Sequence, residues 1–295
     1  MTTDLYIEDD LIGRAVHKSV RHFSELRDLL VDLTRPTTDE HESYLQSVRP
    51  LISYICDRNC ALVMLIQYGY LWDAEMLVRP IFEATLKVLF ISYAEETERK
   101  RRIEEFWELL PEIHRLKQSE RARIALDRVG EGTSADSIFR ELILNPEEEA
   151  RLRAKWPRQH RNTLEQKWSF NGMLRDVEVF MGKHLNVSIA RALTHNYGIS
   201  SHLIHADHAG VSLPVDRNSR NNVEREKLIS AHAARLLSDR LSLGAIAALA
   251  IAFAIGRDQE PILQTLRSAD PLFAQLGNCA IAFYDEIEAD KRVSS

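Results

Sequence analysis

The chain has 295 residues, of which 45% are hydrophobic and 28% charged, and its formal net charge is −6. This composition is typical of a soluble globular protein with a sizeable core, and the negative net charge excludes nucleic-acid binding over the whole surface, so that such binding would need a local basic patch. Low contents of Gly (11) and Pro (9) favour helices over hairpins. Three cysteines make no disulfide framework, and the acidic N-terminus lacks the features of a signal peptide, which together favour a cytoplasmic location.

The N-terminal third is predicted to form three helices. Apolar residues recur at helical spacing over Leu11–Leu33. Thr37 and Glu40 form a candidate capping box, which predicts a second helix over about 39–70. A third, largely apolar helix is predicted over roughly Leu71–Tyr93.

The middle of the chain is highly charged. Residues 95–128 are typical of a long exposed helix, and 130–137 are predicted to form a loop. Asn145 followed by Pro146 and three glutamates is a strong signal for the start of a helix, with Asn as the cap and Pro at the first position.

The C-terminal half is predicted to contain helices over 168–181, 185–209 and 223–255, with a polar loop over 210–222 and a last helix that begins at Asp270-Pro271. The most apolar run, 241–256, is shorter than the roughly 20 residues that span a bilayer. We therefore expect a central core helix and no membrane association.

These elements predict an all-α fold, an irregular bundle of about eight or nine helices. We find no linker that divides the chain, and expect a single domain over 1–295 whose core, about 69–209, contains a charged excursion over about 95–167.

One polar face stands out on the predicted helix 185–209. At about 100° per residue, Tyr197, Ser201, His205 and His208 lie on one narrow arc. A face with a phenol, a hydroxyl and two imidazoles can transfer protons; the alternative is a polar network that orients two helices.

A second polar pattern lies on the third helix, where Glu75, Arg79, Glu83 and Lys87 follow each other at four-residue spacing, with Pro80 expected to kink the helix or to lie near its start. Because the remaining residues are nearly all apolar, these charges are expected to be paired inside the protein. If Arg79 and Glu83 faced Ser201 and His205, the site could bind a phosphate and move a proton.

Two further patterns suggest ligands. The run from 151 to 167 carries six basic residues that could bind RNA phosphates, with Trp156 and Trp168 available to stack on bases; they are Arg151, Arg153, Lys155, Arg158, Arg161 and Lys167. The alternative is a solvated face balanced by nearby acids. His205, His208 and another carboxylate could bind a metal, although we assign neither a metal nor a cofactor.

The segments 69–91, 167–178 and 197–207 resemble a widespread all-helical bacterial domain family of unknown function, whose members carry an Arg-x3-Glu helix and a later Tyr-x3-Ser-x3-His helix. The resemblance covers about 140 residues and brings no established activity. It implies signature positions at Arg79, Glu83, Trp168, Tyr197, Ser201 and His205.

More distantly, the chain resembles HEPN proteins, helical bundles that often act as metal-independent ribonucleases in toxin–antitoxin and phage-defence systems. Their Arg-x4–6-His pattern does not occur within Tyr197–His208, so this resemblance implies that Arg79 supplies the cation from another helix.

Two functions follow as hypotheses. The first is a HEPN-like effector that cleaves RNA without a metal, in bacterial stress or phage defence, with His205 as general base or acid, Arg79 as phosphate clamp, Ser201 and Tyr197 as orienting groups and Glu83 as the partner of Arg79. The second is a non-catalytic helical module that binds a protein partner and forms homo-oligomers.

Overall fold

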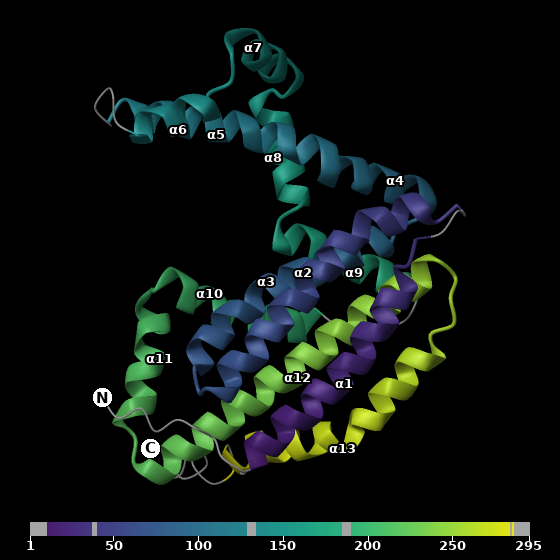
Figure 1. Cartoon of the computed structure of the whole chain (residues 1–295), viewed down its shortest axis with the longest axis vertical. Helices are drawn as coiled ribbons and strands as arrows, with labels where there is room; N and C mark the ends of the chain where they lie inside the picture. Colours follow the sequence, from purple (N-terminus) through teal and green to yellow (C-terminus); the bar gives the residue numbers. More distant parts are fainter. Residues whose placement is uncertain (1–10, 37–39, 129–133, 185–189, 284, 286–295) are drawn as a thin grey trace. The chain divides into compact units, whose positions relative to one another are not determined.

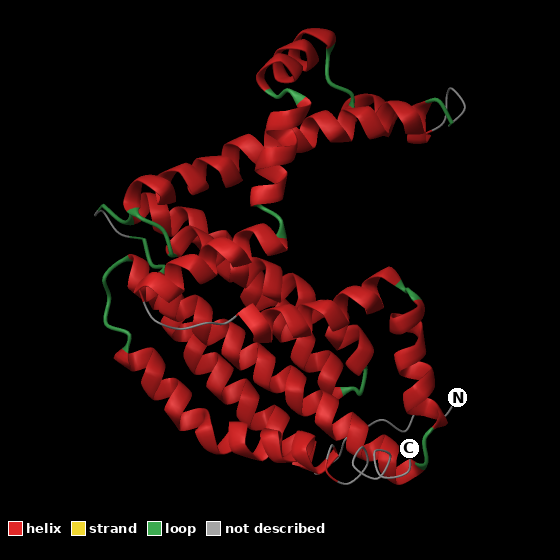
Figure 2. Ribbon diagram, turned by 180° about the vertical axis from the view of Figure 1, so that it is seen from behind, coloured by secondary structure: helices red, strands yellow, loops and turns green. Residues whose placement is uncertain are grey.

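The computed structural model describes the chain except for residues 1–10, 37–39, 129–133, 185–189, 284 and 286–295. Helices are the only regular elements in this described part (Figure 2). The chain divides into two compact units, unit 1 with residues Met1–Tyr93 and Val177–Ser295, and unit 2 with Ala94–Asp176.

Unit 1 is built around one long helix, α12 (Asn222–Ala254), which packs against α1, α2, α3 and α13 (Figure 1). Leu236, Leu237 and Ile251 of α12 are fully buried, and its many alanines allow neighbouring helices to approach closely. The other helices of this unit are α1 (Leu11–Leu33), α2 (Glu42–Gln67), α3 (Leu71–Ser92), α10 (Ala190–His205), α11 (His208–Ser219) and α13 (Glu260–Phe283).

Unit 2 is made of shorter, highly charged helices. They are α4 (Glu96–Glu104), the π-helical segment η1 (Glu105–Leu109), α5 (Leu110–Leu126), α6 (Ser134–Leu142), α7 (Pro146–Lys155) and α8 (Arg158–Lys167). The helix α9 (Phe170–His184) begins in unit 2 and ends in unit 1.

The all-α class is confirmed, but eight or nine helices are too few. Because α4, η1 and α5 follow one another without a break, the described residues form twelve separate helices. One additional helix, α6, begins at Ser134 inside the expected loop 130–137. Another arises because Pro157 separates α7 from α8.

The expected loop 210–222 is wrong, since residues 208–219 form α11. Gly210 and Pro214 suggested a loop, but the Asp207 side chain accepts a hydrogen bond from the Gly210 backbone N–H at 3.0 Å and caps a helix that starts at His208. Pro214 lies inside that helix.

The predicted starts of three other helices can be compared with the structure. The last helix does not begin at Asp270-Pro271 but at Glu260, and it continues through Pro271. At the expected start of the second helix, Thr37 lies outside the described residues, whereas Asn145 caps α7 as expected, accepting from the Glu148 N–H at 2.8 Å.

The charged excursion expected over 95–167 falls within unit 2. Both ends of the expected core, 69 and 209, belong to unit 1. That the whole chain folds as a single domain stays a prediction.

The corner between α10 and α11 depends on a glycine. Gly210 is buried, and a Cβ at this position would overlap the carbonyl oxygen of His202. We expect Gly210→Ala to lower the free energy of unfolding by about 1–3 kcal/mol, because backbone must move to make room. Urea denaturation followed by circular dichroism measures this. Gly198→Ala is the control: it meets no atom within 4 Å and should instead stabilise α10 by about 0.5–1 kcal/mol. Equal stability of the two variants would contradict the close packing of Gly210 against the His202 carbonyl.

One helix in the described residues, α12, is long and apolar enough to cross a membrane by length and composition alone, and 67% of its most apolar window is buried inside the protein. A core helix of unit 1 accounts for the same pattern.

Candidate functional site

The structure brings Arg79 and Glu83 of α3 together with Tyr197 and Ser201 of α10. Arg79 Nε donates to Glu83 at 3.2 Å, Nη1 to the Ser201 hydroxyl at 3.2 Å and Nη2 to the Tyr197 hydroxyl at 2.8 Å. The Tyr197 hydroxyl in turn donates to Glu83 at 3.1 Å, and the guanidinium lies 4.6 Å from the centre of the Tyr197 ring. We call these four residues the Arg79 network. Three of these hydrogen bonds join α3 to α10, and the fourth, between Arg79 and Glu83, lies within α3.

The fifth expected catalytic residue, His205, lies outside this network. Glu83 contacts Tyr197 whereas Glu75 contacts Ser200, so α3 and α10 run antiparallel. His205, one turn beyond Ser201, therefore lies toward the N-terminal end of α3. It is the exposed last residue of α10 and makes no hydrogen bond or ion pair with the described residues.

A buried carboxylate lies one turn away from Arg79. Glu75 has no exposed surface. It accepts from the Ser200 hydroxyl at 2.7 Å, contacts His232 Nε2 at 3.0 Å and forms an ion pair with Arg235. Arg235 also donates to Asp239 at 2.7 Å. Glu75 thus connects α3 to both α10 and α12.

His232 serves this buried site as a neutral group. Its burial, with the nearby positive charge of Arg217 as a second cause, lowers its pKa from 6.5 to about 3. Because a carboxylate only accepts hydrogen bonds, the neutral imidazole donates its Nε2–H to Glu75. The contact is a hydrogen bond and not an ion pair at neutral pH.

Sequence reasoning missed Ser200, His232 and Arg235 as parts of this site. The available signal was the set of polar residues inside the otherwise apolar helix 223–255. His232, Arg235 and Asp239 follow one another there at spacings of three and four residues, which places them on one face.

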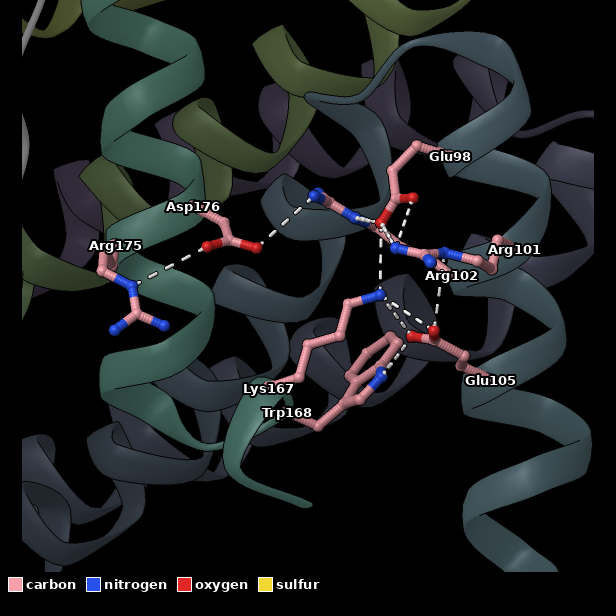
Figure 3. A network of polar contacts seen from close by, with 8 residues as sticks. All are labelled: Glu98, Arg101, Arg102, Glu105, Lys167, Trp168, Arg175 and Asp176. Atoms are coloured by element: carbon pink, nitrogen blue, oxygen red, sulfur yellow. Dashed lines mark hydrogen bonds and ion pairs between the residues drawn. The ribbon is translucent and has the colours of Figure 1, made fainter. Parts of the chain in front are cut away.

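A second polar cluster lies in unit 2 (Figure 3). The carboxylate of Glu105, in the π-helical segment, accepts from Lys167 Nζ at 2.7 and 2.9 Å and from Trp168 Nε1 at 2.9 Å. At its other end, Asp176 forms ion pairs with Arg102 at 3.7 Å and Arg175 at 3.9 Å. The cluster holds α8 and α9 against α4 and η1. Trp168, one of the expected signature residues, contributes to it through the hydrogen bond from its indole N–H to Glu105.

Glu98 belongs to the same cluster and is expected to make unit 2 sensitive to acid. Burial raises its pKa, but hydrogen bonds from Arg101, Arg102 and Lys167 outweigh this effect and lower the pKa from 4.5 to about 2. The stabilisation by ionised Glu98 is therefore complete above about pH 4.5 and is lost as the pH falls toward 2. Urea denaturation at several pH values should show this loss in the wild type and a flatter pH profile in Glu98→Gln. Parallel profiles for the two proteins would contradict it.

Most of the six basic residues expected to bind RNA are paired with acids of unit 2. Arg153 contacts Glu149 at 2.8 Å and Glu120 at 2.9 Å. Ion pairs to acids of the unit are also formed by Lys155 (Glu112, 2.7 Å), Arg161 (Glu120, 3.9 Å) and Lys167 (Glu98, 3.1 Å). Arg151 and Arg158 are exposed. Such pairing reduces the positive potential that non-specific phosphate binding requires, and RNA binding by these residues stays a prediction.

The described residues contain no group of three or more His, Cys, Asp or Glu side chains that could hold a metal ion. His202, next to the stretch considered for a metal, instead pairs with Asp207, with 2.6 Å between His202 Nδ1 and the carboxylate. Asp207 is already engaged as the N-cap of α11.

In comparisons with protein families, with curated proteins and with solved structures, nothing matches this chain.

Proposed function

We propose that this chain is a non-catalytic helical module that binds a protein partner, and that the Arg79 network is the anchor that holds α10 against α3. The supporting observation is that all three guanidinium nitrogens of Arg79 donate to side chains of the protein itself. A phosphate clamp directs its paired N–H groups at the ligand. An anchor directs them at the protein itself: Arg79 donates to Ser201 and Tyr197 of the neighbouring helix α10 and to Glu83 of its own helix.

The anchored helix leads directly into a surface suited to a partner. In α11, Val211 and Val215 lie four residues apart on one face and are 54% and 63% exposed; we call them the α11 apolar face. Helix propensity does not favour valine at exposed helix positions, because the branched side chain loses rotamer freedom in a helix. An exposed pair at helical spacing is typical of the contact surface of an amphipathic helix.

The expected occupant of the α11 apolar face is a second copy of this chain, consistent with the predicted homo-oligomer. A twofold dimer uses the same patch on both subunits, so one short apolar helix can supply both sides of the contact. Because Asp207 and Gly210 fix α11 to the end of α10, the Arg79 network would then hold the contact surface in place.

The oligomeric state tests this function. We expect the wild type to be a dimer by light scattering after size exclusion, and Val211→Asp/Val215→Asp to be a monomer with an unchanged circular dichroism spectrum. The control is Val31→Asp on α1, which is 56% exposed and should leave the dimer intact. Weak dimers form at concentrations on the order of 50–100 µM. If the wild type is a monomer in this range, a second copy of the chain does not occupy the α11 apolar face.

A second candidate function, RNA cleavage, is favoured by one observation. His205 is exposed and has no partner among the described residues, and it lies one turn after Ser201 on the same helix. In this candidate the imidazole takes the proton of an RNA 2′-hydroxyl, whose oxygen attacks the adjacent phosphorus and expels the 5′-oxygen. Arg79 would have to release Ser201 or Tyr197 to stabilise the charge on the phosphate.

The test is incubation of total bacterial RNA and tRNA with wild type and His205→Ala, with and without EDTA. Cleavage that persists in EDTA, disappears in His205→Ala and is kept in the control His208→Ala would establish this second candidate. His208 is the suitable control because it is also exposed and lies at the start of the next helix. Absence of cleavage by the wild type would leave the interaction module as the function.

A further inference from the structure

Three planar side chains from three helices of unit 1 meet at the start of α3. The guanidinium carbon of Arg217, on α11, lies 4.5 Å from the centre of the Trp72 ring of α3. The ring of His232, on α12, lies 4.6 Å from Trp72 at an interplanar angle of 53°. Trp72 is thus flanked by a cation and by a neutral imidazole.

Two N–H donors in this stack are buried without an acceptor. Trp72 Nε1 and Arg217 Nη1 both have almost no solvent contact and no hydrogen-bond partner among the described residues. Leaving a buried donor unsatisfied costs about 1–3 kcal/mol, more when the donor is charged. Because the Arg217 guanidinium lies over the Trp72 ring, the two unsatisfied donors belong to one stacked pair.

The charge around the stack points the same way. Arg217 forms no ion pair with any described residue, whereas the nearby Arg235 is paired with Glu75 and Asp239. Glu75 contacts His232 of the stack, but this carboxylate already has three partners, Ser200, His232 and Arg235. Burial lowers the pKa of Arg217, as expected for a cation that no carboxylate compensates. An anion would give the Arg217 guanidinium the direct hydrogen-bond partner that its Nη1 lacks among the described residues.

We propose that Trp72 and Arg217 form a binding site for a small oxyanion, a phosphate or carboxylate group, whose oxygens accept from Trp72 Nε1 and Arg217 Nη1. Both residues are only partly buried, so solvent reaches part of the stacked pair, and access of the anion to the two buried donor atoms requires the Arg217 side chain to move. Arginine suits this role because its planar fork presents two parallel donors to an oxyanion. The site is independent of the function proposed above, since it uses neither the Arg79 network nor the α11 apolar face.

The tryptophans of the chain make the site measurable. Trp72 is the one tryptophan in unit 1, and Trp107, Trp156 and Trp168 all belong to unit 2. The fluorescence difference between wild type and Trp72→Phe therefore reports Trp72 alone. Sodium phosphate and sodium acetate are titrated separately against sodium chloride at equal ionic strength. A saturable change with phosphate alone assigns a phosphate site, and one with acetate alone assigns a carboxylate site.

Arg217→Gln is expected to weaken the binding of the anion at least tenfold. The control is Arg21→Gln, which should leave the binding unchanged, because the Arg21 side chain is 79% exposed and has its own ion pair. Trp72→Phe removes the second donor and keeps an aromatic ring. Calorimetric titration of this variant should also show at least tenfold weaker anion binding. This second variant tests the site even if Arg217→Gln does not fold. No saturable response of the wild type to either oxyanion, or equal affinity in Arg217→Gln, Trp72→Phe and wild type, would overturn the proposal.

Discussion

Glu75→Ala is expected to lower the free energy of unfolding by about 3–5 kcal/mol, the largest effect of any single polar substitution proposed for this chain. Removing one member of a buried ion pair usually costs more than the contact itself. Without Glu75, Arg235 keeps only Asp239 as a carboxylate partner among the described residues. Glu75 is fully buried and has Arg235 as its ionic partner. It also accepts from Ser200 and contacts His232, and both would lose a hydrogen bond at the same time.

Urea denaturation followed by circular dichroism measures the loss. Glu226→Ala is the matched control, an exposed glutamate on α12 of the same unit, and should change stability by less than about 0.5 kcal/mol. Equal stability of Glu75→Ala and Glu226→Ala would show that the carboxylate does not connect the three helices in solution.

Arg79→Ala is expected to cost roughly 2–4 kcal/mol, less than a fully buried pair because Glu83 is 35% exposed and partly screened by solvent. The substitution removes three hydrogen bonds at once and leaves Glu83 without its ion-pair partner. Arg79→Lys should recover only part of the loss, because a single ammonium group cannot reach three acceptors with the geometry of a guanidinium.

The control for Arg79 is Arg21→Ala, which removes an exposed i,i+4 pair worth a few tenths of a kcal/mol. If Arg79→Ala were as stable as Arg21→Ala, the Arg79 network would not be an anchor. Its residues would then be held in place by other contacts and would be available for a ligand.

Local sequence signals predicted several helices well. The amphipathic pattern of Leu11–Leu33 coincides with α1, and Asn145-Pro146 coincides with the start of α7. Two predictions that depended on Gly and Pro were wrong: the loop expected over 210–222 contains α11, and the helix start expected at Asp270-Pro271 lies inside α13. There, a cap at Asp207 and the packing of α13 outweigh the low helix propensity of these residues.

The residues of the Arg79 network could be selected from sequence because each pair lies at four-residue spacing on one helix. That the two helices meet in this register could not be derived, since it depends on tertiary packing of largely apolar surfaces. The antiparallel order of α3 and α10 places Tyr197 and Ser201 beside Arg79 and carries His205 past it. Glu75 was visible as part of the charged pattern on its helix, but its partners on α12 lie more than 150 residues away.

The central claim is that Arg79 and Tyr197 stabilise each other across the α3–α10 interface. A double-mutant cycle with Arg79→Ala, Tyr197→Phe and the double variant measures that coupling directly from the free energies of unfolding. We predict a coupling of about 1–2 kcal/mol, since the Tyr197 hydroxyl accepts from Arg79 and donates to Glu83. Effects that add to within about 0.3 kcal/mol would contradict the account.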